Sequence, residues 1–363
     1  MNKELSDFAA RLRETIAVGQ SISDTHFNKL ALELFALQRR FNPIFGKICG
    51  AKNVSPQTIV HWTQIPFAPT AVFKELEITS LAPDERATVF HSSGTTEQKP
   101  SRHFHCAESL ALYEASLWNW FERRDSGPRI QNSELLILTP PPELVPHSSL
   151  VHMFETIRGS LAGASVPARR NYFGKISADG SWILDFDVTL SALTDNSKLK
   201  VQNSKFIFGT AFSFVHLLDF LAEKDLRFQL PENSRIMETG GYKNRSRSMP
   251  KAELHLLIET FLGVPRENIL CEYGMSELSS QAYAGGDGRF QFSPWARTQI
   301  VSPETGREVA DGETGLIRIF DLANVFSVAA IQTEDLGIRR GDQFELVGRA
   351  PLAEPRGCSL MTA

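Results

Sequence analysis

Apolar residues recur at helical spacing in the first 40 residues of the chain. Two series show this spacing: Leu5, Phe8, Leu12 and Ile16, then, after Asp24 as a helix N-cap, Phe27, Leu30, Leu34 and Leu37. Residues three or four apart share one face of a helix, so the pattern predicts two amphipathic helices. Residues 41–70 lose this period and contain four prolines, which predicts irregular structure. We therefore expect residues 1–60 to form a helical lead-in packed on the main domain.

Short apolar runs then alternate with helical patterns up to about residue 290. The predicted strands are 87–90, 134–139, 205–208, 235–238 and 268–272, and the predicted helices are 107–123, 211–222 and about 250–261. Continuous apolar runs such as 134–139 are typical of strands buried on both faces of a mostly parallel sheet. This alternation predicts a layered α/β fold over residues 61–290.

The pattern changes from about residue 291. Short strands at 298–302, 315–322 and 344–347 alternate with Gly/Asp turns, which predicts a small β-rich subdomain over residues 291–350. Residues 351–363 contain prolines and a glycine but no helical period. We expect them to form a mobile C-terminal tail.

Composition narrows the class of protein. A net charge of -4 on 363 residues gives no global basic field for nucleic acid. No apolar run reaches the length of a membrane span, and the charged N-terminus lacks the apolar core of a signal peptide. The 25 phenylalanines are compatible with a phenylalanine-rich core or with an apolar pocket.

The four cysteines, Cys49, Cys106, Cys271 and Cys358, lie far apart along the chain. Their spacing shows neither a disulfide framework nor a zinc motif. We expect a cytoplasmic protein with reduced thiols.

The loop at residues 91–100, HSSGTTEQKP, is the first candidate for chemistry. Its small hydroxylated residues and backbone N–H groups could surround an anion, and Lys99 or Arg102 could add positive charge. It lacks the Gly-Lys of a Walker A loop, and a plain surface turn is the alternative. Its predicted place between a strand and the helix at 107–123 would direct that helix N-terminus toward the loop.

Further motifs follow the loop in a fixed order. SSGTT at 92–96 is followed by EYGMSE at 272–277, TED at 333–335 and Gly348-Arg349. This ordered set resembles the adenylate-forming, acyl-activating enzyme superfamily. Within it the chain is most similar to the acyl-protein synthetases of bacterial luciferase operons, through Phe73-Lys74, PPP followed by SSL at 140–150, TGGYK at 239–243, and RGCS at 356–359.

The resemblance implies a fold and a set of roles. The fold would be the large N-terminal domain of adenylate-forming enzymes, with the β-rich subdomain and without their usual C-terminal domain. The implied ATP-binding residues are Ser92, Ser93, Gly94, Thr95, Thr96, Gly240, Gly241, Tyr273, Gly274, Met275, Ser276, Asp335 and Arg349. Among them Tyr273 would flank the adenine and Asp335 would bind the ribose hydroxyls. Glu277 would coordinate Mg²⁺.

The chain departs from the superfamily pattern in two respects. Glu97 stands where the loop often has a second glycine, and Lys99 precedes Pro100. The chain also ends shortly after Arg349, before the small domain that carries a catalytic lysine in the superfamily. Another cation must then stabilise the charge at the α-phosphorus, and Lys243 and Lys99 are both candidates.

The expected reaction follows from the resemblance. An apolar carboxylic acid, such as a fatty acid, would be activated with ATP to acyl-AMP, its chain held near His152, Met153 and Phe154. Cys358, beside Arg356, would accept the acyl group as a thioester and deliver it to a partner such as an acyl reductase. One alternative is transfer to coenzyme A, a carrier protein or an amine. Another is a non-catalytic, nucleotide-binding interaction subunit.

Overall fold

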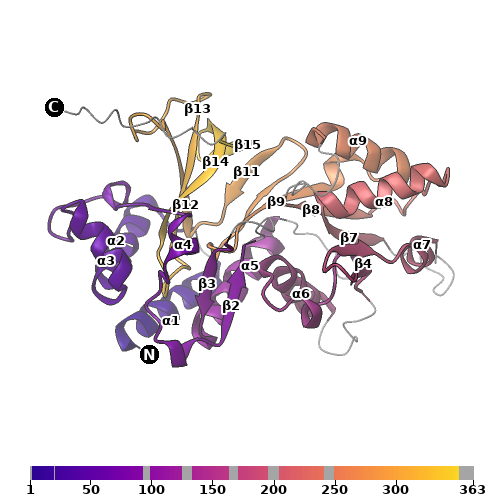
Figure 1. The fold of residues 1–363 in the computed structure, drawn as a ribbon. Coiled ribbons are helices and arrows are strands. Elements are labelled where there is room, and N and C mark those ends of the chain that lie inside the picture. Colours follow the sequence, from indigo (N-terminus) through magenta and orange to yellow (C-terminus); the bar gives the residue numbers. More distant parts are fainter. Residues whose placement is uncertain are drawn as a thin grey trace, which may run out of the picture.

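The computed structural model describes residues 2–19, 21–92, 99–124, 133–162, 171–194, 204–240 and 249–350. Its helices are α1 (Lys3–Val18), α2 (Asp24–Phe41), α3 (Pro43–Ala51), α4 (Val72–Glu75), α5 (Ala107–Arg124), α6 (Ser149–Ala162), α7 (Phe186–Thr194), α8 (Ala211–Glu223) and α9 (Lys251–Leu262). The two helices predicted before residue 41 are confirmed as α1 and α2 (Figure 1).

A large mixed sheet runs through the molecule. Its strands in spatial order are β12 (Ala296–Val301), β13 (Thr314–Asp321), β14 (Ala330–Arg340), β15 (Gln343–Arg349), β11 (Arg289–Phe292), β10 (Ala282–Ala284), β9 (Ile269–Tyr273), β8 (Arg235–Thr239), β7 (Lys205–Thr210) and β4 (Glu134–Ile137). The short strand β1 (Ala68–Pro69) pairs with β14. Strands β4, β7, β8 and β9 are parallel, whereas β9 to β15 pair antiparallel.

Two small hairpins lie beside this sheet. One pairs β2 (Thr88–His91) with β3 (Arg102–His105), and the other pairs β5 (Gly174–Ile176) with β6 (Trp182–Leu184). The predicted β-rich segment after residue 291 is present, and its strands continue the same sheet through β11 and β10.

The parallel strands separate two layers of helices. Alternating strand residues such as Leu136 and Ile207 pack with α8 and α9, whereas their neighbours Ile137 and Phe208 pack with α5 and α6. Because successive side chains of a strand point to opposite faces, one apolar run fills both layers. Figure 1 shows α8 and α9 side by side along one face. This confirms the predicted layered α/β architecture.

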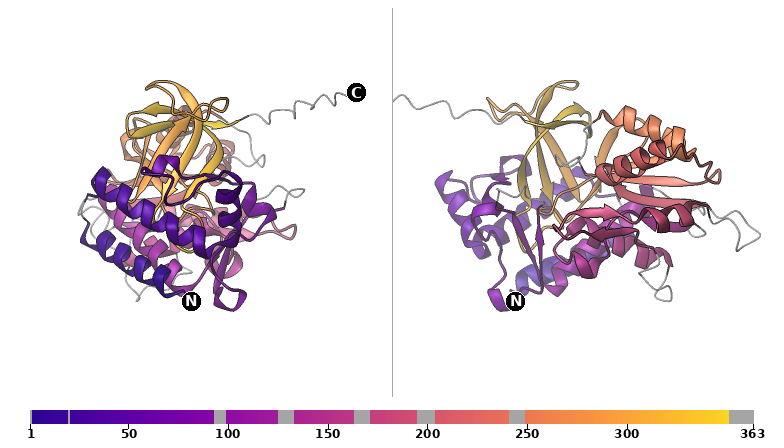
Figure 2. Two further views of the ribbon diagram at one scale, coloured as in Figure 1. Left: turned by 90° about the vertical axis from the view of Figure 1, so that its left-hand side faces the viewer. Right: turned by 45° about the vertical axis from the view of Figure 1, so that its right-hand side comes forward.

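The N-terminal helices are anchored to the C-terminal half of the chain. On α2, the buried Gln38 side chain donates to the carbonyl oxygens of Asn324 and Val325 at 2.7 and 3.1 Å. Asn42, at the end of α2, donates to the carbonyl oxygen of Ser327 at 3.1 Å. In Figures 1 and 2 these helices and the α8–α9 pair lie at opposite ends of the molecule, with the strands β12–β15 between them.

Two sequence expectations are wrong. Residues 43–51 form α3 instead of irregular structure, because Asn42 caps the helix by accepting from the N–H of Phe45, and Pro43 occupies its first turn, where a missing N–H costs nothing. The loop at 91–100 connects β2 to β3, so it does not lie between a strand and a helix. The N-terminus of α5 follows β3 and therefore does not open directly onto this loop.

Candidate active site

The end of strand β9 carries the first group of candidate residues. Tyr273 is buried, and its hydroxyl donates to Oδ2 of Asp335 on β14 at 2.8 Å. Arg349 on β15 lies opposite Asp335 in the ladder, with its Nε 3.8 Å from Oδ1. Strand pairing thus brings together three residues that are separated by up to 76 positions in the sequence (349 minus 273).

Gly274 lies against a buried carboxyl group. A Cβ at this position would stand 2.4 Å from Oε1 of Glu272, so no larger residue fits without displacing that side chain. Glu272 itself accepts a hydrogen bond from the hydroxyl of Thr239, its register partner on β8. Gly240 follows Thr239 with a φ of +67°, a left-handed conformation that favours glycine. Thr239-Gly240 and the EYG motif therefore meet at the ends of two neighbouring strands.

The base of the β2–β3 hairpin contacts the same stretch. The hydroxyl oxygen of Ser92 accepts from the N–H of Ser101 at 2.9 Å, and the hydroxyls of Ser101 and Ser276 lie 3.4 Å apart. Ser276 in turn donates to Oε2 of Glu277 at 3.1 Å. Ser101, Ser276 and Glu277 are buried. Ser92 of the candidate phosphate loop is thus linked to Glu277, the proposed metal ligand, through Ser101 and Ser276.

Sequence reasoning missed two histidines on β3. The ring of His103 donates from Nδ1 to the carbonyl oxygen of Ser276 at 2.7 Å, and His105 lies next to it with ring centroids 4.4 Å apart. Burial lowers the pKa of His103 to about 4 and that of His105 well below its ordinary value, so both rings are neutral near pH 7. The alternating RHFH pattern could have signalled a strand with a histidine face, but histidines are not usually counted as core residues.

The candidates for the acyl chain lie on α6. The ring of His152 is near Phe90, with centroids 5.3 Å apart, and its Nε2 lies 3.0 Å from Oε1 of Glu114. Phe154 packs on the other side of the helix against Phe208, 5.3 Å between centroids, and Met153 is buried in the core. The three residues therefore do not share one face. His152 alone joins the ring cluster that continues through Phe90 to His105.

The remaining candidates are less tightly placed. Lys99 is half-exposed, with its Nζ 3.7 Å from Oε2 of Glu75, and Met275 is partly buried. Ser93, Gly94, Thr95, Thr96, Gly241, Lys243 and Cys358 lie outside the described residues.

Burial also affects the carboxyl groups of Glu272 and Asp335. It raises the pKa of Glu272 to about 7, against the hydrogen bond from Thr239, so about half of these groups are neutral near pH 7. Burial likewise raises the pKa of Asp335, while the Tyr273 hydroxyl and the Arg349 guanidinium act in the opposite direction. The partners of the two carboxyl groups, Thr239 for Glu272 and Tyr273 with Arg349 for Asp335, thus favour the ionised form that burial disfavours.

The donor set suits Mg²⁺ held together with a substrate phosphate. Glu277 offers a carboxylate, the oxygen ligand that Mg²⁺ prefers, beside the Ser101 and Ser276 hydroxyls. Within the described ranges, Glu277 belongs to no group of three potential metal ligands. A single protein carboxylate is sufficient when phosphate oxygens share the metal, because Mg²⁺ commonly takes only one or two carboxylate ligands from the protein.

Comparison with solved structures gives the fold. A crystal structure of 2-hydroxyisobutyryl-CoA ligase in an open conformation aligns with a TM-score of 0.66 at 12% identity, covering 90% of this chain and 74% of that one. The ATP-bound RpMatB-BxBclM chimera B3 aligns with a TM-score of 0.51 at 17% identity, covering 74% of this chain. The chain spans 49% of the chimera's length. Both neighbours are adenylate-forming enzymes, which confirms the predicted fold class.

Comparison of sequences gives the family. The long-chain-fatty-acid–luciferin-component ligase of Aliivibrio fischeri is 26% identical over 361 residues, covering 93% of this chain and 87% of the relative. The Vibrio harveyi protein of the same name is 26% identical over 188 residues, 49% of each chain. Among the described residues, no helix has the length and apolar character needed to cross a membrane. The model of the family "Acyl-protein synthetase, LuxE" matches residues 146–363, and the chain therefore belongs to this family of acyl-activating ligases.

Proposed function

We propose that this protein activates an apolar carboxylic acid, such as a long-chain fatty acid, with ATP and then carries the acyl group on Cys358. One carboxylate oxygen of the acid bonds to the α-phosphorus of ATP while the bond to the bridging oxygen breaks and pyrophosphate leaves. The Cys358 thiolate then attacks the acyl carbonyl carbon, and AMP departs with the electron pair of the C–O bond. The thioester is delivered to an acyl-accepting partner such as a reductase.

One observation carries the first half of this proposal. Four segments far apart in the sequence meet around β9: the hairpin base at Ser92 and Ser101, the end of β8 at Gly240, the stretch 273–277, and the β14–β15 pair. These segments bring together three groups: the ring of Tyr273 to stack on the adenine, the carboxylate of Asp335 for the ribose hydroxyls, and the carboxylate of Glu277 for Mg²⁺. Adenylation needs these groups together, because catalysis of phosphoryl chemistry rests on positioning and charge stabilisation.

Each described residue then has a role in this proposal. Tyr273 flanks the adenine, Asp335 with Arg349 holds the ribose, and the carboxylate of Glu277 would hold Mg²⁺, which neutralises charge on the phosphates when bound. Lys99 and Lys243 are the candidate cations for the α-phosphate. The neutral ring of His103 fixes the backbone of Ser276 and so keeps Glu277 directed toward the hairpin.

The acid is proposed to enter beside the ring cluster of His105, Phe90 and His152. This cluster links His152 on α6 to Ser276 through His103, which contacts His105 and bonds to Ser276. It is apolar at Phe90 and carries no net charge at the two buried histidines. Such a surface suits the chain of a fatty acid and leaves its carboxylate to meet the phosphates.

The test separates the two half-reactions. ATP–pyrophosphate exchange is measured with a series of carboxylic acids, and acyl transfer is followed as hydroxylamine-sensitive label on the protein. Cys358→Ser is expected to keep acid-dependent exchange and to lose the label, whereas the buried Cys49→Ser on α3 keeps both. Label that persists in Cys358→Ser excludes the tail mechanism.

The same measurements decide between the alternatives. If label appears only on added coenzyme A, a carrier protein or an amine, the chain passes its adenylate to a free acceptor. Absence of exchange with every acid, together with ATP binding, identifies a non-catalytic interaction subunit.

A further inference from the structure

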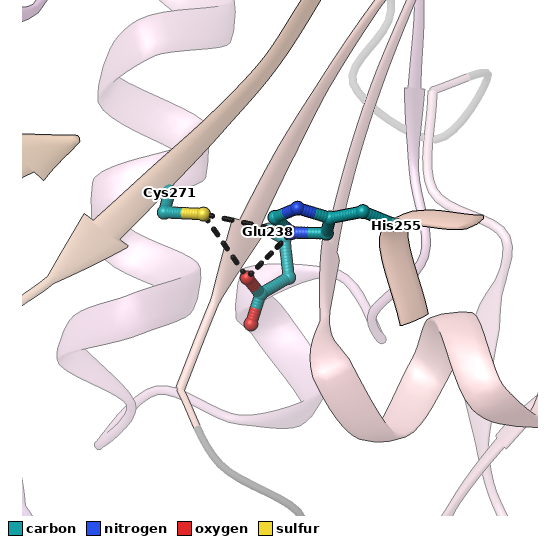
Figure 3. Close-up of side chains that lie close together, drawn as sticks. All are labelled: Glu238, His255 and Cys271. Atoms are coloured by element: carbon teal, nitrogen blue, oxygen red, sulfur yellow. Dashed lines mark hydrogen bonds and ion pairs between the residues drawn. The ribbon is translucent and has the colours of Figure 1, made fainter. Parts of the chain in front are cut away.

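Three side chains with different metal-ligating atoms meet on the α9 side of the sheet, away from the residues discussed above. Glu238 on β8 and Cys271 on β9 are register partners, so their side chains project from the same face. His255 on α9 lies over them, and all three are buried (Figure 3). This cluster is not recognisable from the sequence, since its members are 16 and 17 residues apart (271 minus 255, 255 minus 238) and match no zinc motif.

The three ligand atoms form a small triangle. Sγ of Cys271 lies 3.4 Å from Oε2 of Glu238 and 3.7 Å from Nε2 of His255, and the last two atoms are 3.7 Å apart. In a tetrahedral zinc site with Zn–S of about 2.3 Å and Zn–N and Zn–O of about 2.1 Å, ligand atoms are about 3.4–3.6 Å apart. The observed separations agree with these edges to within about 0.3 Å.

The cluster also has unused lone pairs. Within the described residues, Oε1 of Glu238 and Nδ1 of His255 are buried without a hydrogen-bond partner. Among the described residues, the cation that pairs with this carboxylate is Lys251 at the start of α9, with its Nζ 3.3 Å from Oε2 of Glu238. Burying a carboxylate with one oxygen unpaired is costly, and a bound cation removes that cost.

We propose that Glu238, His255 and Cys271 bind one thiophilic divalent cation, with Zn²⁺ as the physiological candidate. A set of one sulfur, one nitrogen and one oxygen ligand excludes Mg²⁺ and Ca²⁺, which take oxygen ligands, and is typical of zinc. The fourth tetrahedral position is open to water or another donor. On binding, the Cys271 thiol releases its proton to solvent and a sulfur–metal bond forms.

Such an ion would connect three elements at the edge of the active site. Thr239 and Glu272 follow Glu238 and Cys271 directly and point to the opposite face, and Tyr273 comes next. Fixing β8, β9 and α9 to one ion would therefore hold the strand ends that carry Gly240 and Tyr273. The role is structural, so it is independent of the reaction proposed above.

The experiment uses the full-length protein, stripped of metal by a chelator and titrated with Zn²⁺ against a chromophoric chelator. One equivalent of Zn²⁺ is expected to bind, and Cys271→Ser and His255→Gln should each weaken affinity by more than about 10-fold. Cys49→Ser and Cys358→Ser are the matched controls and should bind as the parent does. Co²⁺ in place of Zn²⁺ should give a thiolate charge-transfer band that Cys271→Ser alone among the three cysteine variants removes.

Either of two results overturns the proposal: the parent protein binds no stoichiometric Zn²⁺, or Cys271→Ser binds it unchanged. Should Cys271→Ser not fold, the X-ray absorption spectrum of the zinc-loaded parent decides. It must show one sulfur at about 2.3 Å together with nitrogen or oxygen ligands. A first shell without sulfur rejects this site.

Discussion

The phenol hydroxyl of Tyr273 on β9 donates to the carboxylate of Asp335 on β14 at 2.8 Å, although three strands lie between β9 and β14 in the order of the sheet. The two residues come from motifs separated by 62 residues, and the bond orients the carboxylate that is proposed to hold the ribose. Asp335 is partly buried, which raises its pKa, and this hydrogen bond and the nearby Arg349 act in the opposite direction and favour the ionised carboxylate.

Tyr273→Phe tests this relationship. Loss of a hydrogen bond to a partly buried carboxylate should lower the free energy of unfolding by roughly 1–3 kcal/mol. The KM for ATP in pyrophosphate exchange should rise several-fold, because Asp335 is less often charged and less well oriented. Tyr172→Phe is the control, since Tyr172 donates to Glu155 at 2.7 Å elsewhere in the molecule. It should lose comparable stability at an unchanged KM for ATP, and an equal rise in both variants would contradict the assignment.

Gly274→Ala tests the packing against Glu272. The new methyl group would meet Oε1 of Glu272 at 2.4 Å, so the Glu272 side chain must move, which strains its hydrogen bond from Thr239. We expect a stability loss of about 1–3 kcal/mol in urea denaturation and a lower kcat/KM for exchange. Gly285→Ala has open space around the added carbon and should change neither quantity.

The pH dependence of stability reports the buried Glu272. Its pKa is about 7 in the fold and near 4.3 in the unfolded chain, so the folded state binds the proton more tightly. The resulting stability is fully present below about pH 4, falls as the pH rises, and is lost above about pH 7. Glu272→Gln stays neutral throughout, so its stability relative to the parent should increase between pH 5 and pH 8, on the order of 1–3 kcal/mol.

This difference is measured by urea denaturation at both pH values, which cancels the titration of other groups such as Asp321. The exposed Glu304→Gln serves as the control and should show no pH-dependent difference. A constant difference between Glu272→Gln and the parent would show that Glu272 is ionised across this range.

Glu277→Gln tests the proposed magnesium ligand. The amide can still accept from the Ser276 hydroxyl, so the fold should persist, but it carries no charge for a cation. The Mg²⁺ concentration for half-maximal pyrophosphate exchange should rise at least about 10-fold. Glu267→Gln, on an exposed turn, should leave it unchanged. Equal magnesium dependence in both variants would assign the ion to another ligand.

The sequence predicted the fold best for helices and strands whose buried face consists of apolar residues. Most core positions of the N-terminal helices and of the parallel strands are apolar, so periodicity was sufficient to predict these elements. It failed at β3, where the buried positions are His103 and His105, and a histidine face does not read as apolar. Because β3 is not recognised, the sequence predicts that the loop at 91–100 leads directly from a strand to the helix at 107–123.

The candidate site shows a similar division. Tyr273, Glu277 and Asp335 could be predicted as site residues because each lies in a short sequence motif, EYGMSE or TED. The buried partners Glu272, Ser101 and His103 were missed, because only strand register and hairpin closure reveal what they touch. The Glu238–His255–Cys271 cluster was inaccessible for the same reason, since it depends on a helix crossing two paired strands.

The bonds from Gln38 to the backbone of residues 324 and 325 have a consequence for how the protein is made. The partners are 286 and 287 positions apart, so at ~5–20 residues per second a ribosome needs roughly 15–60 s to synthesise the second after the first. During that time the Gln38 amide lacks the two carbonyl oxygens that accept from it in the folded protein. The N-terminal helices therefore reach their final packing only after residue 325 has been made, and truncation before residue 324 leaves Gln38 without these acceptors.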